Sequence, residues 1–181
     1  MSSARGALHW SAVGDEPLRV RDLLAEPVAL AIGAVPSAQV AAIDAALADT
    51  AAFCPAYDVS KEHSANCVVV AGRRGGVTSY AAVIVQATRR ADINGAVRRH
   101  LDLRKISFAA VDEAVTRTGM EYGGITPIGL PEDWLVLIDT GVVASGDVVV
   151  GSGLRRSKLL VAAAELASLP GAVVLPLAQA D

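Results

Sequence analysis

Residues 123–129, with the sequence GGITPIG, combine a bare stretch of backbone with a stiff one. Glycine has no side chain, so another molecule can come close to the main-chain N–H and C=O groups. Pro127 fixes its own φ angle and restricts the backbone of Thr126 before it. Such a loop suits recognition of a ligand by the backbone, and it suits a tight structural turn equally well.

Side chains that could act as nucleophiles or metal ligands are few and scattered. Cys54 and Cys67 are not spaced as a redox pair, and Cys67 begins the apolar segment CVVVA, which favours a packed thiol over a nucleophile. The three histidines are far apart in the sequence and form no local metal motif. We therefore expect no metal and no other cofactor. Asp139 ends the apolar segment WLVLID, where a carboxylate can either cap a loop or line a site.

Positive charge is concentrated in the middle of a chain whose net charge is −3. Residues 73–105 carry eight basic side chains against two acidic ones, a balance that can attract a phosphate backbone or simply form a solvated surface. The GRRGG segment at 72–76 is compatible with phosphate binding, but its position between two apolar segments favours a hairpin turn.

The composition limits the class of protein. A chain of 181 residues, 52% of them hydrophobic, is long enough for one domain with a substantial core. No apolar run approaches the roughly 18 residues that span a membrane, and the first twenty residues lack the apolar core of a signal peptide. Two cysteines without a secretion signal indicate a reducing compartment. We expect a cytoplasmic protein that does not contact a membrane.

The sequence predicts an α+β (mixed α/β) single domain, in which helices surround one mixed, mostly antiparallel sheet. A Rossmann glycine motif and a Walker A loop are both absent. We expect residues 1–37 to be an N-terminal extension packed on the core and residues 38–181 to be the domain proper. Ser37 is expected to cap a helix over 38–50, followed by a loop at 53–60. A helical turn is expected at 60–65, and further helices at 93–101 (capped by Asp92), 110–119 (closed by Gly119) and 163–169. Strands are expected at 67–71, 77–87, 104–109, 134–139, 147–153, 157–162 and 172–178.

The order of three motifs resembles that of the YbaK and prolyl-tRNA synthetase-associated editing domain family. These motifs are TGMEYGGITPIG at 118–129, LVLIDTGV at 135–142 and DVVVGSGLRRSKLLVAAAEL at 147–166. The resemblance covers roughly residues 38–178. It implies hydrolytic editing of mischarged aminoacyl-tRNA.

The resemblance also implies roles for the glycine loop. The family's Gly-x-x-x-Pro loop corresponds to Gly123 through Pro127, and its backbone surrounds the aminoacyl ester at the tRNA 3′ end. N–H donors near Gly123 and Gly124 would stabilise the developing oxyanion, and Pro127 would keep them preorganised. Thr126 is expected to belong to the same catalytic loop. A ribose hydroxyl, or a water that it holds, can then assist the attack without a protein nucleophile or a metal.

One position departs from the family pattern. Many members carry a lysine at the start of the first core strand, where this chain has Asn66. Asparagine can donate a hydrogen bond but adds no positive charge, and charge-assisted hydrogen bonds are about twice as strong as neutral ones. Lys61 or the arginines of 73–105 could replace the missing cation in space.

The remaining candidate residues follow from proximity to these motifs or from charge. For contact with the aminoacyl group we expect Met120, Tyr122, Ile128, Asp139, Ser152 and Gly153. For contact with tRNA we expect Lys61, Arg73, Arg74, Arg155 and Arg156, although GLRR at 153–156 is equally compatible with a plain hairpin turn.

These observations predict a freestanding aminoacyl-tRNA deacylase that acts in trans on a small aminoacyl group, since 181 residues leave no room for a synthetase body. Its partners would be the aminoacylated 3′ end of tRNA and possibly a synthetase, and it would be a monomer or a homodimer. A non-catalytic module that binds aminoacyl-tRNA or an aminoacyl-adenosine-like molecule is the alternative, favoured by Asn66. A third possibility is an interaction protein that dimerises through residues 1–35.

Overall fold

A long β-hairpin dominates the computed structural model, which describes residues 3–14 and 20–179. Strands β3 (Ala65–Arg74) and β4 (Val77–Gln86) pair antiparallel over their full length, from Ala65 opposite Gln86 to Arg74 opposite Val77. The two residues between them, Gly75 and Gly76, have φ angles of 56° and 83°. Two consecutive positive φ angles are what a tight type I′ hairpin turn requires, so the predicted hairpin at GRRGG is confirmed.

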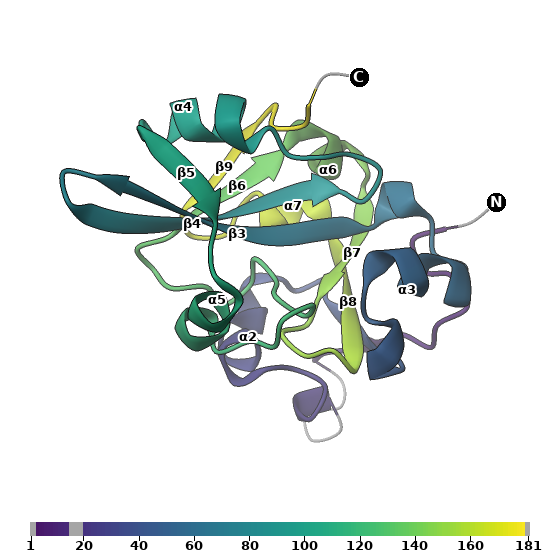
Figure 1. The fold of residues 1–181 in the computed structure, drawn as a ribbon. Coiled ribbons are helices and arrows are strands. Elements are labelled where there is room, and N and C mark those ends of the chain that lie inside the picture. Colours follow the sequence, from purple (N-terminus) through teal and green to yellow (C-terminus); the bar gives the residue numbers. More distant parts are fainter. Residues whose placement is uncertain (1–2, 15–19, 180–181) are drawn as a thin grey trace.

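This hairpin is the centre of a five-stranded sheet with the order β5-β3-β4-β6-β9 (Figure 1). On one side β5 (Lys105–Phe108) pairs antiparallel with β3. On the other side β6 (Leu135–Asp139) and β9 (Ala172–Leu175) add two parallel strands. The buried strand β6 and the inner half of β4 are apolar on both faces, as strands covered on both sides must be.

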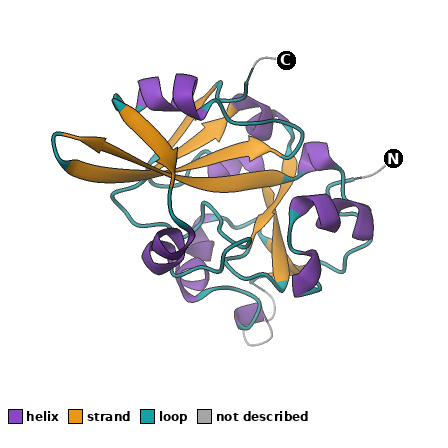
Figure 2. Cartoon of the chain, viewed as in Figure 1, coloured by secondary structure: helices purple, strands orange, loops and turns teal. Residues whose placement is uncertain are grey.

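The remaining strands form a second, antiparallel sheet of order β1-β2-β8-β7. Its strands are β1 (Ser11–Ala12), β2 (Gln39–Ala42), β7 (Asp147–Gly151) and β8 (Ser157–Ala162). The predicted α+β single-domain fold is confirmed, with the difference that the strands divide between two sheets instead of one. Figure 2 shows both sheets and the short helices around them.

The helices are short. They are α2 (Glu26–Ala31), η1 (Ile32–Ala34), η2 (Ala45–Leu47), α3 (Thr50–Ala56), η3 (Lys61–His63), η4 (Ile93–Val97), α4 (Arg98–His100), α5 (Val111–Thr118), α6 (Thr140–Ala144) and α7 (Ala163–Leu166). Two predicted helix ends are confirmed: the Asp92 carboxylate accepts from the N–H groups of Gly95 and Ala96, and Gly119 ends α5 with a left-handed φ of 66°. Within the described ranges, no helix is both long enough and apolar enough to cross a membrane.

The helix predicted over 38–50 is wrong. Residues 39–42 form strand β2 instead, and helix α3 occupies part of the predicted loop at 53–60. Ser37 caps no helix, because its hydroxyl donates to the Glu165 carboxylate and accepts from the Ala162 N–H. Pairing with β8 decides the conformation of this segment, because a place beside an existing strand outweighs the weak helix preference of alanine.

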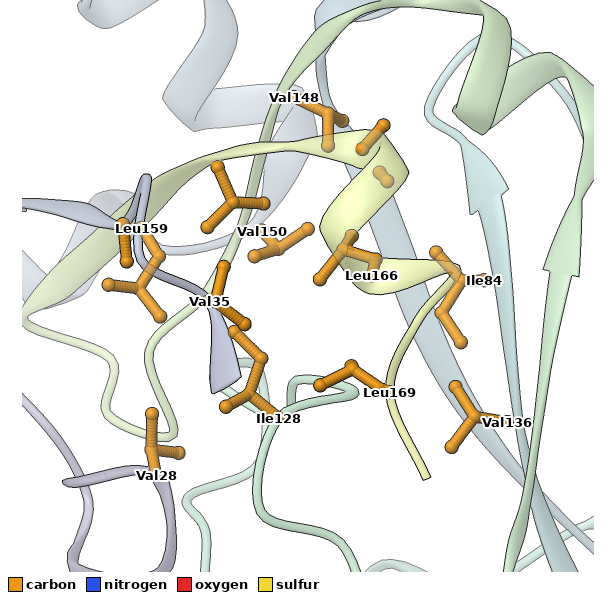
Figure 3. Close-up of a cluster of buried hydrophobic side chains, with 14 of the residues drawn as sticks. Val28, Val35, Ile84, Ile128, Val136, Val148, Val150, Leu159, Leu166 and Leu169 are labelled. Carbon is orange, nitrogen blue, oxygen red and sulfur yellow. The ribbon is translucent and has the colours of Figure 1, made fainter. Parts of the chain in front are cut away.

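The main core lies between the two sheets and is closed by the N-terminal segment (Figure 3). Ile84 and Val136 come from the five-stranded sheet, and Val150 and Leu159 from the four-stranded one. Val28 and Val35 of the N-terminal segment are fully buried among them. Of the predicted extension 1–37, residues 1, 2 and 15–19 lie outside the described part. A second apolar cluster covers the opposite face of the five-stranded sheet, beneath η4 and α4.

Asp139 joins three elements at the end of β6. Its carboxylate is buried and accepts hydrogen bonds from the N–H groups of Gly141 (2.8 Å), Leu177 (2.7 Å) and Ala178 (2.8 Å). It therefore caps α6 and fastens the segment that follows β9. Of the two roles open to this residue, the structure shows the capping one.

A pair of glycines brings the 123–129 loop against the turn after β7. The Gly153 N–H donates to the Gly124 carbonyl (2.8 Å), and the Glu121 N–H donates to the Gly153 carbonyl (2.8 Å). A Cβ atom on Gly124 would lie 2.7–2.8 Å from the backbone of Leu154, and one on Gly151 would collide with the Gly124 carbonyl. The two backbones touch because neither residue has a side chain.

Replacing Asp139 by alanine should lower the free energy of unfolding by about 2–4 kcal/mol, since it leaves three buried or half-buried N–H donors without an acceptor. Urea denaturation followed by circular dichroism measures this. Asp133→Ala, an exposed carboxylate shortly before β6, is the matched control. Equal stability of the two variants would show that the capping bonds do not hold this junction.

Gly124→Ala should cost about 2 kcal/mol of stability, because the new methyl group must displace the Leu154 backbone. Gly33→Ala is the control, since its added Cβ meets nothing within 4 Å and is expected to be neutral or slightly stabilising. Thermal unfolding of both variants measures this difference in stability. An unchanged unfolding midpoint for Gly124→Ala would contradict the close contact.

Candidate functional site

A cavity of about 560 Å³ opens between the start of β3, the glycine loop and the second sheet. Its walls come from six separate segments of the chain. The residues that line it are Ala48, Asp49, Thr50, Ala65, Asn66, Cys67, Val68, Val69, Phe108, Ala109, Val111, Ala114, Tyr122, Gly123, Ile125, Gly151 and Lys158. The structure thus brings together three of the predicted site residues: Asn66, Tyr122 and Gly123.

The glycine loop contributes its backbone to this cavity. Gly123 has a φ of 86°, which favours glycine, and it lines the cavity together with Ile125. Within the described part of the chain, the N–H groups of these two residues have no hydrogen-bond partner. The Gly124 N–H, by contrast, donates to the Glu121 carbonyl at 2.9 Å. The free donors of the loop are therefore those on either side of Gly124.

Asn66 stands where the family lysine was expected, at the second position of β3. Its Oδ1 accepts a hydrogen bond from the Thr50 hydroxyl at 2.6 Å. The amide is thereby fixed by α3, and its nitrogen adds a neutral donor to the wall.

A cation does line the cavity, but it comes from β8. The Lys158 side chain is buried, with 8% of the residue exposed, and its Nζ donates to the Ala48 carbonyl at 2.8 Å. The ammonium also lies over the Phe53 ring, 5.2 Å from its centroid. Burial lowers the pKa of Lys158 to about 8, although the nearby Asp49 carboxylate opposes the shift.

Sequence reasoning did not single out Lys158. It considered Lys61 and the arginines of 73–105 as replacements for the family lysine, and none of these residues lines the cavity. The signal was present as a lone lysine inside the apolar segment SKLLVA, because a lysine in a buried strand needs a specific reason to be there.

Arg155 holds the cavity mouth together. Its guanidinium donates to the carbonyls of Tyr122 (3.2 Å) and Ala45 (3.1 Å) and lies 3.6 Å from the Asp49 carboxylate. Its backbone N–H donates to the Glu121 carboxylate at 2.6 Å. The arginine thus links the glycine loop to the 45–49 segment on the opposite side.

Large apolar side chains surround the opening. Tyr122 is 60% exposed, Phe108 is 64% exposed, and Val111 is also exposed. Two aromatic rings on a chain with few aromatics, both at one opening, provide flat surfaces against which a base could stack.

Cys67 lines the cavity without the properties of a nucleophile. Burial raises the pKa of its thiol to about 12, so the reactive thiolate is scarce at neutral pH. In the described ranges no group of three or more side chains is placed to bind a metal ion.

Other residues predicted for catalysis or for contact with the aminoacyl group do not line the cavity. Met120 and Ile128 are buried in the main core. The Thr126 hydroxyl is buried and has no hydrogen-bond partner among the described residues, and Pro127 beside it is buried too. The Ser152 hydroxyl bonds to the Ser157 hydroxyl at 2.7 Å. Three of the site predictions thus fall on residues that build the loop's support: Met120, Ser152 and Gly153, which packs against α2.

The basic candidates are dispersed. Arg156 donates to the Asp22 carbonyl and so fastens the N-terminal segment, and Lys61 is exposed on η3. Arg74 pairs with Asp102 at the far end of the hairpin. Arg73 lines a second, shallower groove of about 920 Å³ together with Ala71, Gly72, Thr78, Arg104, Lys105, Ile106 and Ser107.

Solved structures with the same fold support a common architecture. One, described as a "putative trans-editing enzyme for prolyl tRNA synthetase", is 21% identical, with a TM-score of 0.74 over 86% of this chain and 97% of that one. Another, hypothetical protein APE2540, is 22% identical, with a TM-score of 0.75 over 85% of this chain and 100% of that one. No curated protein shows significant sequence similarity to the chain. The family model of the aminoacyl-tRNA editing domain matches residues 44–169, and the chain therefore belongs to the aminoacyl-tRNA editing domain family.

Proposed function

We propose that the chain is a trans-acting deacylase that hydrolyses the ester between a small aminoacyl group and the 3′ end of mischarged tRNA. The observation that carries this proposal is the convergence of unpaired backbone donors and a polar wall on one cavity. Gly123 and Ile125 provide the donors, and Asn66 stands on the wall. Similarity to a structure described as a putative trans-editing enzyme supports action in trans.

The cavity suits the transition state of ester hydrolysis, in which negative charge develops on the carbonyl oxygen. Two N–H groups that point at a developing oxyanion stabilise it strongly, because they are fixed before the reaction begins. The close glycine contact with the turn after β7 supplies that rigidity. Small apolar side chains of β3, Ala65, Val68 and Val69, form part of the lining, which favours a small aminoacyl group.

Deacylation of a panel of mischarged tRNAs by the full chain tests this function. We expect hydrolysis above the spontaneous rate for one or two small aminoacyl groups. Asn66→Ala should reduce the rate roughly tenfold, the effect of one neutral hydrogen bond to a transition state. Asn94→Ala, an exposed asparagine in η4 outside the cavity, is the control. Spontaneous rates across the whole panel would reject the proposal.

A binding module without turnover is the second candidate, and the neutral Asn66 is the observation that favours it. The same panel separates the two functions. Tight binding of a non-hydrolysable aminoacyl-adenosine analogue, together with no hydrolysis, would select the module.

We further propose that the groove beside β5 carries the RNA backbone leading to the cavity. Arg73 pairs in register with Lys105 and Thr78, so the three side chains share one face of the sheet. Val69, which lines the cavity, is four residues before Arg73 on that same face, a distance of about 13 Å. The groove contains three basic side chains and, among the residues that line it, no acidic one. A few nucleotides would span the distance from the cavity.

Arg104→Ala combined with Lys105→Ala should weaken the use of tRNA and leave the ester chemistry intact. Removing two phosphate contacts to a single strand should lower the slope of log KM against log salt by about 1.4. Hydrolysis of the same aminoacyl group on adenosine alone should be unaffected. Arg5→Ala combined with Arg21→Ala removes the same charge from the N-terminal segment and should behave as the natural chain. An unchanged salt slope for the groove variant would contradict the proposed path.

A further inference from the structure

We propose that Lys158 supplies the positive charge of the active site and that this chain has moved the cation from β3 to β8. The inference rests on the proposed deacylase function and concerns a residue that belongs to a different strand from the family lysine. It explains how a chain with Asn66 can retain catalysis.

Strand pairing brings the two positions to one cavity. An isolated parallel bridge joins Ser64, just before β3, to Val149 of β7. On the other side of β7, Gly151 is the direct partner of Lys158. Asn66, Gly151 and Lys158 all line the cavity, and β7 lies between the strands that carry the asparagine and the lysine.

Gly151 allows the glycine loop to lie at the level of Lys158. It has no side chain, and the Gly124 carbonyl fills the position where its Cβ would be. Because Gly123, Ile125 and Lys158 all line the cavity, the loop donors and the ammonium border the same space. A side chain at 151 would push the glycine loop away from the strand that pairs with Lys158.

The surroundings of Lys158 indicate a functional charge. An ammonium has three donors, and among the described residues only the Ala48 carbonyl accepts from it. No carboxylate in the described ranges lies within ion-pair distance of it. The charged and titratable groups that face it are Asp49, Cys54 and Arg155. Keeping an ammonium in such a place costs stability, which is expected for a catalytic group and unexpected for a structural one.

The reaction requires no covalent bond between the substrate and the protein. Water adds to the ester carbonyl carbon, and the carbonyl oxygen becomes an oxyanion between the loop N–H groups and the Lys158 ammonium. The bond from carbon to the ribose oxygen then breaks. The ribose oxygen takes one proton of the attacking water, the other proton passes to the solvent, and the amino acid leaves as a carboxylate.

Single-turnover deacylation of the mischarged tRNA that the panel shows to be hydrolysed fastest tests the role of Lys158. Lys158→Met removes the charge and keeps most of the volume, so it should fold and lose at least a hundredfold in rate. Moving the charge back, in Asn66→Lys with Lys158→Met, should restore at least tenfold of that loss. Arg21→Met, which removes an exposed positive charge outside the cavity, should leave the single-turnover rate at saturating enzyme unchanged.

The pH dependence provides a readout that a purely structural lysine would not affect. The ammonium is present below pH 8 and is lost as the pH rises through about 8. The ratio of natural to Lys158→Met rates should therefore fall toward one above that pH. Lys158→Arg stays charged throughout and should not show this fall.

The outcomes separate this inference from the proposed function. An inactive natural chain would reject the deacylase itself. An active natural chain with an equally active, folded Lys158→Met would overturn the role of Lys158 alone. If Lys158→Met fails to fold, the pH profiles of the natural chain and of Lys158→Arg decide instead, and identical profiles would overturn the inference.

Discussion

The contact between the backbones of Gly124 and Gly151 is the constraint on which the rest of the site depends. It brings a loop that follows α5 against a strand of the second sheet, with a peptide carbonyl where a side chain would otherwise be. The Gly153 N–H completes the junction. Since β7 lies between β8 and the start of β3, one contact fixes the loop relative to both walls of the cavity. The loop therefore needs no helix or strand of its own to be held rigidly.

The sequence indicates much of the five-stranded sheet because its local signals agree with its tertiary pairing. The last two glycines of GRRGG specify the hairpin turn, and Asp92 and Gly119 mark helix ends. The apolar, β-branched runs of β4 and β6 distinguish these segments from helices. The segment at 38–50 misleads for the opposite reason. Alanine-rich residues favour a helix in isolation, and only the presence of β8 makes 39–42 a strand.

The parts of the candidate site that depend on local backbone chemistry were predictable from the sequence. The parts that depend on residues from distant segments coming together in the fold were not. The glycine loop can be recognised from one sequence because several glycines close to a proline are an unusual combination. Asn66 can be recognised because it interrupts the family pattern, which has a lysine there. Lys158 is 92 residues further along the chain, and nothing local relates it to either. Alternation along a strand likewise cannot show which of Met120, Tyr122 and Ile128 faces the cavity, because the connection between α5 and β6 is an irregular loop in which alternation does not hold.

The arrangement of β3, β7 and β8 has a consequence for how such sites change over evolutionary time. With Gly151 on the middle strand, Asn66 on one side and Lys158 on the other, the cavity can receive a long side chain from either of two strands. Lysine at both positions 66 and 158 would put two like charges into one small cavity, and lysine at neither would leave the cavity without that charge. An exchange in two single steps would therefore pass through one of these two forms. A column of aligned residues would record this exchange as the loss of a catalytic group, whereas the cavity itself would have kept its charge.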